Sequence, residues 1–334
     1  MHSMNAQLFC GLDVHRSGSS YAAIVDERGE LVKERKLSND SIPEFIGSYR
    51  PTRIAMEASS SITSIYRALV RDGYDVLVSH PRKTRLIAES RIKTDRVDAR
   101  ALAELLRLDA LPQSYMPDES LASLREMVRR RAFLVREKAK FKVKLRDYLA
   151  YNGIQVGIEE GLFTKRGVEW LRSLKLEPVD MYLRLISSLN AETLTLSRTL
   201  KELAPNDADV SLLMTIPGIG YYSALLIKSE IGSIDRFPDG EHLCSYAGIV
   251  PSLHSSGSHA RYGSITKQGS RWLRWIMVEA AYTHSKEDTS ISRFYHSLAQ
   301  RKGKQVAAVA TARKLLLCCY SVLKNRRPYS DQAS

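Results

Sequence analysis

The chain has 334 residues, of which 44% are hydrophobic, so it contains enough apolar material for about two packed domains. Its 50 lysine and arginine residues outnumber 37 acidic ones, and the net charge of +13 favours nucleic acid as the partner over a merely solvated basic surface. The four cysteines form no C-x-x-C pair, which speaks against a zinc site. Without a leader pattern or an apolar run of about 20 residues, we expect a cytoplasmic protein with no membrane partner.

Residues 1–115 carry alternating strand and helix patterns. The order is three strands, a helix, a buried strand, a helix, a strand and a strongly amphipathic helix, predicted at residues 8–14, 20–25, 31–37, 41–49, 53–58, 61–71, 74–79 and 97–108. Three consecutive strands followed by helix–strand alternation is the order of a ribonuclease-H-like α/β fold. We therefore expect an α/β N-terminal domain of that type.

Residues 116–205 are predicted to form a helical arm. No Pro or Gly interrupts residues 118–150, where apolar positions recur at helical spacing beside many lysines and arginines, as in a long helix or coiled coil. Residues 152–178 show no clear pattern, and helical periodicity returns at 179–203. The remainder, 206–327, reads as a compact, mostly helical domain with irregular stretches around 248–270.

Four acidic residues stand where an α/β domain builds sites. Asp13 ends the first predicted strand, Glu57 ends a buried strand, and Asp95 and Asp98 begin a helix, three residues apart on one face. Each has an ordinary structural alternative: Asp13 as a turn residue, Asp95 as a helix N-cap, and Asp98 as an acid favoured by the helix dipole. As a set they predict a divalent-metal site.

A cluster of carboxylates suits phosphodiester chemistry. Cleavage requires charge neutralisation on the attacking and leaving oxygens, and Mg²⁺ or Mn²⁺ held by carboxylate oxygens supplies it. Lys93, Arg96 and Arg100 surround the acidic pair in the sequence and are expected to hold nucleic-acid phosphates.

A glycine turn precedes a helix predicted at residues 221–230. Gly218 and Gly220 lie in the sequence PGIG, which resembles half of a helix–hairpin–helix and lets backbone N–H groups approach a phosphate. Glycine turns before helices are common, so an ordinary turn is the alternative. We predict nucleic-acid contact at both glycines.

Ser256 lies in an SSGS stretch without nearby acids. No acidic residue occurs between His242 and Val278, whereas basic residues do, namely Arg261, Lys267, Arg271 and Arg274. A serine attacks phosphorus only if its proton is removed and the phosphate charge is neutralised. The cations are suited to the second task, and His254, His259 or a metal to the first. An ordinary polar loop is the alternative, and Ser255 and Ser258 are rival nucleophiles.

The motifs GLDVH, AMEAS and KTDRVDARALAELL together resemble the RuvC-like DEDD domain of the IS110/IS1111 family of transposases. RFPDGEHLCSYAGIVPS, SSGS and ITKQGSRWLRW resemble the Transposase_20 segment of the same family, in the expected order. The resemblance implies that Asp13, Glu57, Asp95 and Asp98 bind divalent metal and that Ser256, just before the glycine, is the catalytic serine. AMEASSS departs from the usual E-x-T/S-G, which alters the loop after Glu57 but removes no ligand.

The resemblance further implies a DNA transposase/recombinase that cleaves and rejoins donor and target strands through a phosphoserine intermediate. It implies a homo-oligomer, a dimer or tetramer, that is nucleoid-associated in a bacterium and is guided in some relatives by a structured non-coding RNA. Three alternatives stay open: a resolvase-like metal nuclease that uses water, an actin-like ATPase suggested by GLDVHRSGSS, and a nucleic-acid-binding protein without activity.

Overall fold

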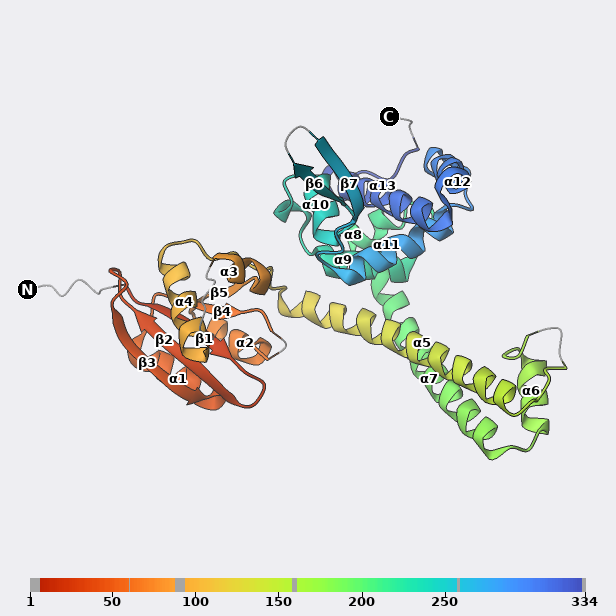
Figure 1. The fold of residues 1–334 in the computed structure, drawn as a ribbon, viewed down its shortest axis with the longest axis horizontal. Coiled ribbons are helices and arrows are strands. Elements are labelled where there is room, and N and C mark those ends of the chain that lie inside the picture. Colours follow the sequence, from red (N-terminus) through yellow and green to blue (C-terminus); the bar gives the residue numbers. More distant parts are fainter. Residues whose placement is uncertain (1–6, 60, 88–93, 158–160, 257–258, 332–334) are drawn as a thin grey trace, which may run out of the picture. The chain divides into compact units, whose positions relative to one another are not determined.

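Figure 1 shows the fold of the chain in a computed structural model, which describes residues 7–59, 61–87, 94–157, 161–256 and 259–331. Of residues 253–256 and 259–262 it describes only the backbone. The chain separates into two compact units at the Met116–Pro117 bond. Residues 1–116 form unit 1 and residues 117–334 form unit 2. The expected further division of the second unit at residue 205 remains a prediction.

Unit 1 is built on a five-stranded sheet in the order β3-β2-β1-β4-β5. The strands are β1 (Phe9–Val14), β2 (Ser19–Val25), β3 (Leu31–Ser38), β4 (Arg53–Glu57) and β5 (Asp75–Ser79). β1 and β2 pair antiparallel, as do β2 and β3, whereas β4 runs parallel to β1 and β5 parallel to β4. All five predicted strands are present, so the expectation of a mixed α/β N-terminal part is confirmed.

Helices cover both faces of this sheet. One face carries α1 (Ile42–Tyr49) and α2 (Thr63–Arg71), whose Ile46 and Leu69 join Leu12 and Met56 of the strands in one core cluster. The other face carries α4 (Asp95–Arg107), in a second cluster around Phe9 and Ala55. Successive side chains of a strand point to opposite faces, so Asp13 and Glu57 lie on the α4 face. The 3₁₀ turn η1 (Asn39–Ser41) and α3 (Pro81–Ile87), which was not predicted, complete the unit.

Gly11 allows α4 to lie directly on β1. A Cβ atom at Gly11 would stand 2.0 Å from the carbonyl oxygen of Ala99 and 2.6 Å from the backbone nitrogen of Ala103. These are backbone atoms of the helix, so any side chain at Gly11 must displace the helix itself. The contact therefore sets how close the first turn of α4 comes to the end of β1.

Replacing Gly11 with alanine should destabilise the protein by roughly 3 kcal/mol, the upper end for an overpacked core, and should weaken divalent-metal binding because Asp95 and Asp98 move with α4. Urea unfolding and Mn²⁺ titration measure the two effects. Gly47→Ala is the matched control, because a Cβ atom there meets nothing within 4 Å. Unchanged stability and metal binding in Gly11→Ala would show that α4 tolerates displacement.

Unit 2 begins with a long helical hairpin. Its helices are α5 (Glu119–Tyr151), α6 (Lys165–Ser173) and α7 (Glu177–Leu203). α5 and α7 lie side by side and antiparallel, with α6 at their far end (Figure 1). Arg131 Nε donates to Ser197 Oγ at 2.8 Å, and Lys138 Nζ donates to Asn190 Oδ1 at 2.9 Å. The predicted helices are confirmed, and α6 accounts for part of the stretch that showed no pattern.

The rest of unit 2 is mostly helical, as predicted. Its helices are α8 (Ala208–Leu213), α9 (Tyr221–Ile231), α10 (Gly240–Ala247), α11 (Arg271–His284), α12 (Ser290–Lys302) and α13 (Lys304–Asn325), with 3₁₀ turns η2 (Ala204–Asn206) and η3 (Ile234–Arg236). The expectation of an irregular stretch around 248–270 was wrong for most of its length. That stretch holds an antiparallel hairpin of β6 (Pro251–Ser256) and β7 (His259–Ile265). Its small and polar residues lack the apolar alternation that predicts strands.

The sequence predicts no uninterrupted apolar run of membrane-spanning length, and Arg313 and Lys314 interrupt the most apolar helix, α13. Within the described residues, α13 alone has the length and composition to cross a bilayer. However, half of its apolar window is buried, and Ala312, Leu315 and Leu316 are fully inaccessible in the core of unit 2. A buried core helix passes the same test, so α13 is weak evidence for a membrane segment.

Candidate active site

The predicted acidic residues of unit 1 come from the carboxyl ends of two adjacent strands and the start of one helix. Leu12 pairs with Met56 in the parallel register of β1 and β4, so Asp13 and Glu57 follow side by side. The N-cap of α4 is Thr94, whose Oγ1 accepts a hydrogen bond from the Val97 amide at 3.3 Å. Asp95 is therefore not the cap, and its carboxylate is available to the site.

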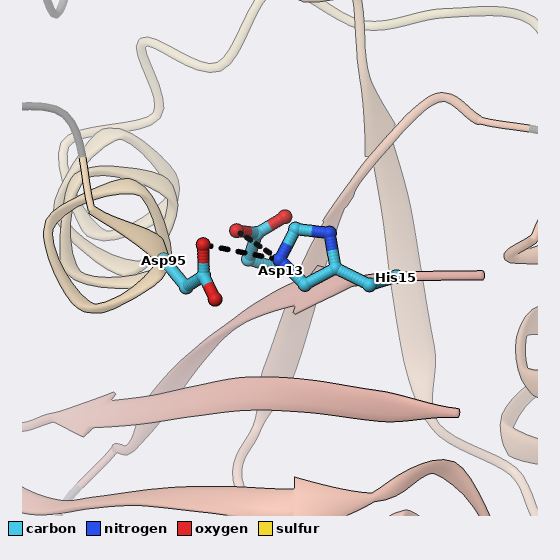
Figure 2. A group of neighbouring side chains, drawn as sticks. All are labelled: Asp13, His15 and Asp95. Atoms are coloured by element: carbon cyan, nitrogen blue, oxygen red, sulfur yellow. Dashed lines mark ion pairs between the residues drawn. The ribbon is translucent and has the colours of Figure 1, made fainter. Parts of the chain in front are cut away.

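His15 lies between two of the predicted ligands (Figure 2). Its Nε2 is 3.3 Å from Asp13 Oδ2 and 3.2 Å from Asp95 Oδ1. Neither contact has hydrogen-bond geometry, and this buried nitrogen has no hydrogen-bond partner among the described residues. His15 was not among the ligands predicted from the sequence. The available signal was its i, i+2 spacing from Asp13, which puts both side chains on one face of an extended chain.

The pKa of the Asp13 carboxyl is raised to about 6, and burial is the largest cause. Within this net shift His15 lowers the pKa, whereas the negative charges of Asp95, Asp98 and Glu57 raise it. Asp13 is only 8% exposed, so the acids that surround it act through a poorly screened environment. All four predicted acidic residues therefore interact electrostatically at one place.

This donor set fits a divalent cation. The ligand atoms of Asp13, His15 and Asp95 all lie within 4.8 Å of one another. The set offers carboxylate oxygens, which hard cations prefer, and one imidazole nitrogen that has no other hydrogen-bond partner in the described structure. A cation also offsets the cost of gathering four acids at a buried carboxyl. The residues thus suit a metal centre, with Glu57 and Asp98 close enough to add negative charge.

A cation should stabilise the protein more at pH 7.5 than at pH 5. The folded pKa of Asp13, about 6, lies above the ordinary value of 3.8. In metal-free protein the neutral Asp13 carboxyl therefore contributes its full share to stability below about pH 4. This contribution is lost as the pH rises through 6, because the buried carboxyl then becomes charged. At pH 5 a proton competes with the cation, which lowers the apparent affinity about tenfold. Thermal unfolding with and without Mg²⁺ at both pH values measures this, and equal shifts would contradict it.

The cations predicted to hold phosphates beside the acidic site have protein partners. Arg96 Nη2 and Arg100 Nε lie 2.5 and 2.6 Å from the two carboxylate oxygens of Glu34 on β3. A phosphate would have to displace Glu34 or share these guanidinium groups with it. Lys93 lies outside the described residues, and phosphate contact by all three remains a prediction.

The PGIG turn joins two helices, α8 and α9, and packs against α11. A Cβ atom at Gly218 would stand 2.7 Å from the His284 backbone nitrogen, so this glycine is required by packing. The His284 side chain is fully buried and its Nδ1 lies 2.6 Å from the Pro217 carbonyl oxygen. Gly220 is exposed, with open space where a side chain would be. Nucleic-acid contact at the two glycines remains a prediction, and Gly220 is the accessible one.

Ser256 is the last residue of β6 and pairs in register with His259 of β7. The backbone therefore places it at the tip of a hairpin. Ser258 lies outside the described residues, as do the side chains of Ser255, Ser256 and Arg261. Of the other predicted cations, Lys267 and Arg271 are exposed, whereas Arg274 is half-buried and donates to the Ala247 carbonyl oxygen at 2.8 Å.

A buried carboxylate, which the sequence analysis did not single out, ties the helical hairpin to the segment that follows β7. Glu230 on α9 is 2% exposed and accepts two hydrogen bonds from Arg129 of α5, at 2.9 and 2.6 Å. Its other oxygen accepts from Ser270 Oγ at 2.8 Å, and Ser270 caps α11. This pairing holds the start of α11 against α5, and nothing in local periodicity indicates it.

Two family models match the chain. A model of IS110-type DEDD transposases matches residues 10–151, and a model described as "Transposase IS116/IS110/IS902 family" matches residues 210–296. Together they cover more than half of the chain, the first match in its N-terminal part and the second in its C-terminal part. The chain belongs to the IS110/IS1111 family of transposases. It is therefore an enzyme that acts on DNA, and the resemblance drawn from its motifs is confirmed.

Two relatives support this assignment over nearly the full length, and a third matches a shorter part of the chain. A probable family 20 transposase of Pseudomonas aeruginosa is 26% identical over 321 residues, which cover 91% of this transposase and 94% of the relative. The transposase for insertion sequence element IS1111A of Coxiella burnetii is 24% identical, and the match covers 98% of this chain and 92% of the relative. A pilin gene-inverting protein of Moraxella bovis is 34% identical over 125 residues, which are 36% of this chain and 39% of the relative.

Proposed function

We propose that this transposase cleaves and rejoins DNA with two groups, a divalent-metal centre at the acidic residues of unit 1 and a serine nucleophile, Ser256, in unit 2. The observation that carries the metal half is the convergence of Asp13, His15 and Asp95 within 4.8 Å at a buried carboxyl. Family membership supports the serine half, since Ser256 lies within the matched C-terminal segment. Glu57 and Asp98 complete the proposed ligand set, and Mg²⁺ or Mn²⁺ is the proposed ion.

The proposed reaction balances without an added energy source. Asp13, His15 and Asp95 would hold the divalent metal, which would neutralise charge on the scissile phosphate. Ser256 Oγ attacks phosphorus while the bond to the leaving strand oxygen breaks; His254 or His259 accepts the serine proton, and the leaving oxygen takes up a proton and becomes a hydroxyl. A free strand end then attacks the phosphoserine and releases Ser256. The number of phosphoester bonds stays constant throughout, so no nucleotide is consumed.

The architecture supports finer proposals about each part. We infer a RuvC-like fold for unit 1, because its strands run β3-β2-β1-β4-β5 with only the first three antiparallel. We infer that the α5–α7 hairpin is a coiled-coil arm whose basic residues hold nucleic-acid backbone.

A structured non-coding RNA is the proposed guide, and a dimer or tetramer of nucleoid-associated chains is the proposed assembly. Recombination that survives ribonuclease treatment would exclude the guide, and a monomeric mass on DNA would exclude the assembly.

A metal nuclease that uses water is the competing function, because it needs the same acidic site but no serine. A suicide substrate separates the two. Nicked DNA that loses its leaving strand traps a covalent intermediate if the protein is the nucleophile, and trapping yields no adduct if water is. We expect a protein–DNA adduct in the presence of Mg²⁺, visible as a retarded band on denaturing gels. Cleavage without any adduct would favour the nuclease.

A further inference from the structure

Buried polar atoms without hydrogen-bond partners concentrate where the strands β1 and β5 of the unit 1 sheet end. Among the described residues of unit 1 these atoms are His15 Nε2, Ser79 Oγ, His80 Nδ1 and Thr84 Oγ1. The first belongs to the acidic site. The other three lie within six residues of one another, where β5 ends and α3 begins. Folded proteins pair nearly all buried polar groups, so such a concentration points to a partner that binds there.

Ser79 is the best placed of the three with respect to the acidic residues. It is the last residue of β5 and pairs in parallel register with Glu57, the last residue of β4. Its carbonyl oxygen accepts a hydrogen bond from the Ala58 amide at 3.1 Å, which fixes the backbone just after Glu57. The two strand ends are therefore held side by side.

The side chains of Ser79 and Glu57 also share a face. Leu77, two residues before Ser79, packs against the cluster beneath α4, whereas Val76 and Val78 pack on the opposite face. Alternation along the strand then puts Ser79 on the α4 face with Asp13 and Glu57. Asp13, Glu57 and Ser79 thus form a row across β1, β4 and β5. The Ser79 side chain is completely buried, so bulk water is not its partner.

We propose that Ser79 is a positioning residue of the acidic site: its hydroxyl donates a hydrogen bond to the Glu57 carboxylate, directly or through one water, and orients that carboxylate toward a bound divalent cation. This inference rests on the proposed metal centre and adds a residue to it. Carboxylate ligands are commonly oriented by such donors, whose loss lowers metal affinity without touching a ligand. Ser79 does not touch the DNA or the cation.

A leftover hydroxyl with no role is the plain alternative, and the chain offers a matched comparison. Thr311 on α13 is also completely buried, and its Oγ1 has no partner among the described residues, but it lies in the helical core of unit 2. Neither hydroxyl has a hydrogen-bond partner among the described residues, and the proposed bond from Ser79 to Glu57 forms with the cation in place, so neither Ser79→Ala nor Thr311→Val should lower the stability of metal-free protein. Only the first should affect metal binding.

The test measures Mn²⁺ affinity of the full chain by electron paramagnetic resonance and thermal unfolding of the metal-free protein. Ser79→Ala should weaken Mn²⁺ binding about tenfold with an unchanged unfolding temperature, while Thr311→Val should match wild type in both measurements. Ser79→Gly also removes the hydroxyl and should show the same loss, so the test does not depend on the folding of one variant.

Wild-type Mn²⁺ affinity in Ser79→Ala, together with loss of binding in Asp13→Asn, would overturn the role of Ser79 and leave the metal centre intact. Wild-type affinity in Asp13→Asn would overturn the metal centre itself. A Ser79→Ala variant with a lowered unfolding temperature and normal affinity would show that Ser79 serves the fold alone.

Discussion

Replacing Asp13 with asparagine should reduce DNA cleavage by roughly three orders of magnitude, because a bound metal contributes several kcal/mol to the transition state of phosphoryl transfer. The change preserves the shape of the side chain and removes the most buried of the four acids. Its neighbours Asp95 and Glu57 repel the charge of Asp13, so the metal-free variant should be at least as stable as wild type. Calorimetric titration with Mn²⁺ and a cleavage assay measure the two losses together.

Asp75→Asn is the control for this change. Asp75 begins β5, at the end of the strands opposite to the acidic site, and its Oδ2 lies 3.0 Å from Arg53 Nε. The same loss of one negative charge on the unit 1 sheet should leave Mn²⁺ binding and cleavage as in wild type. A similar loss of cleavage in both variants would show that the net charge of the unit matters rather than a metal centre.

Replacing Ser256 with alanine should lower strand transfer by roughly four orders of magnitude or more, as expected when the nucleophile of a covalent mechanism is removed. Trapping with the suicide substrate should yield no protein–DNA adduct, while Mn²⁺ binding at unit 1 stays normal because the residue belongs to unit 2. This separation of metal binding from covalent chemistry distinguishes the serine mechanism from attack by water.

Ser255→Ala is the neighbouring control, and it should retain both the adduct and strand transfer. If Ser255→Ala or Ser258→Ala abolished the adduct instead, the nucleophile would be misassigned by one or two positions along the hairpin. Full strand transfer by Ser256→Ala, with cleavage still dependent on Asp13, would replace the serine mechanism with hydrolysis and rejoining by another route.

Elements with strong periodicity could be predicted from the sequence, and those without it could not. The 33 residues of α5 carry no Gly or Pro and repeat apolar positions along one helix face, so their prediction needed only local information. α3 is short, with three basic residues and no apolar period, and the β6–β7 hairpin consists mainly of small and polar residues. Such segments adopt their structure because neighbouring elements favour it, which a local pattern does not record.

The sequence by itself determined that acids stand at two strand ends and at a helix start, because strand and helix periods are properties of a few consecutive residues. Tertiary structure decided which side chains meet. α4 rests on the bare backbone of Gly11, and this contact brings Asp95 to Asp13 and His15 across about 80 positions of chain. The same docking pairs Arg96 and Arg100 with Glu34. Distances between residues so far apart in sequence depend on how helix and sheet pack.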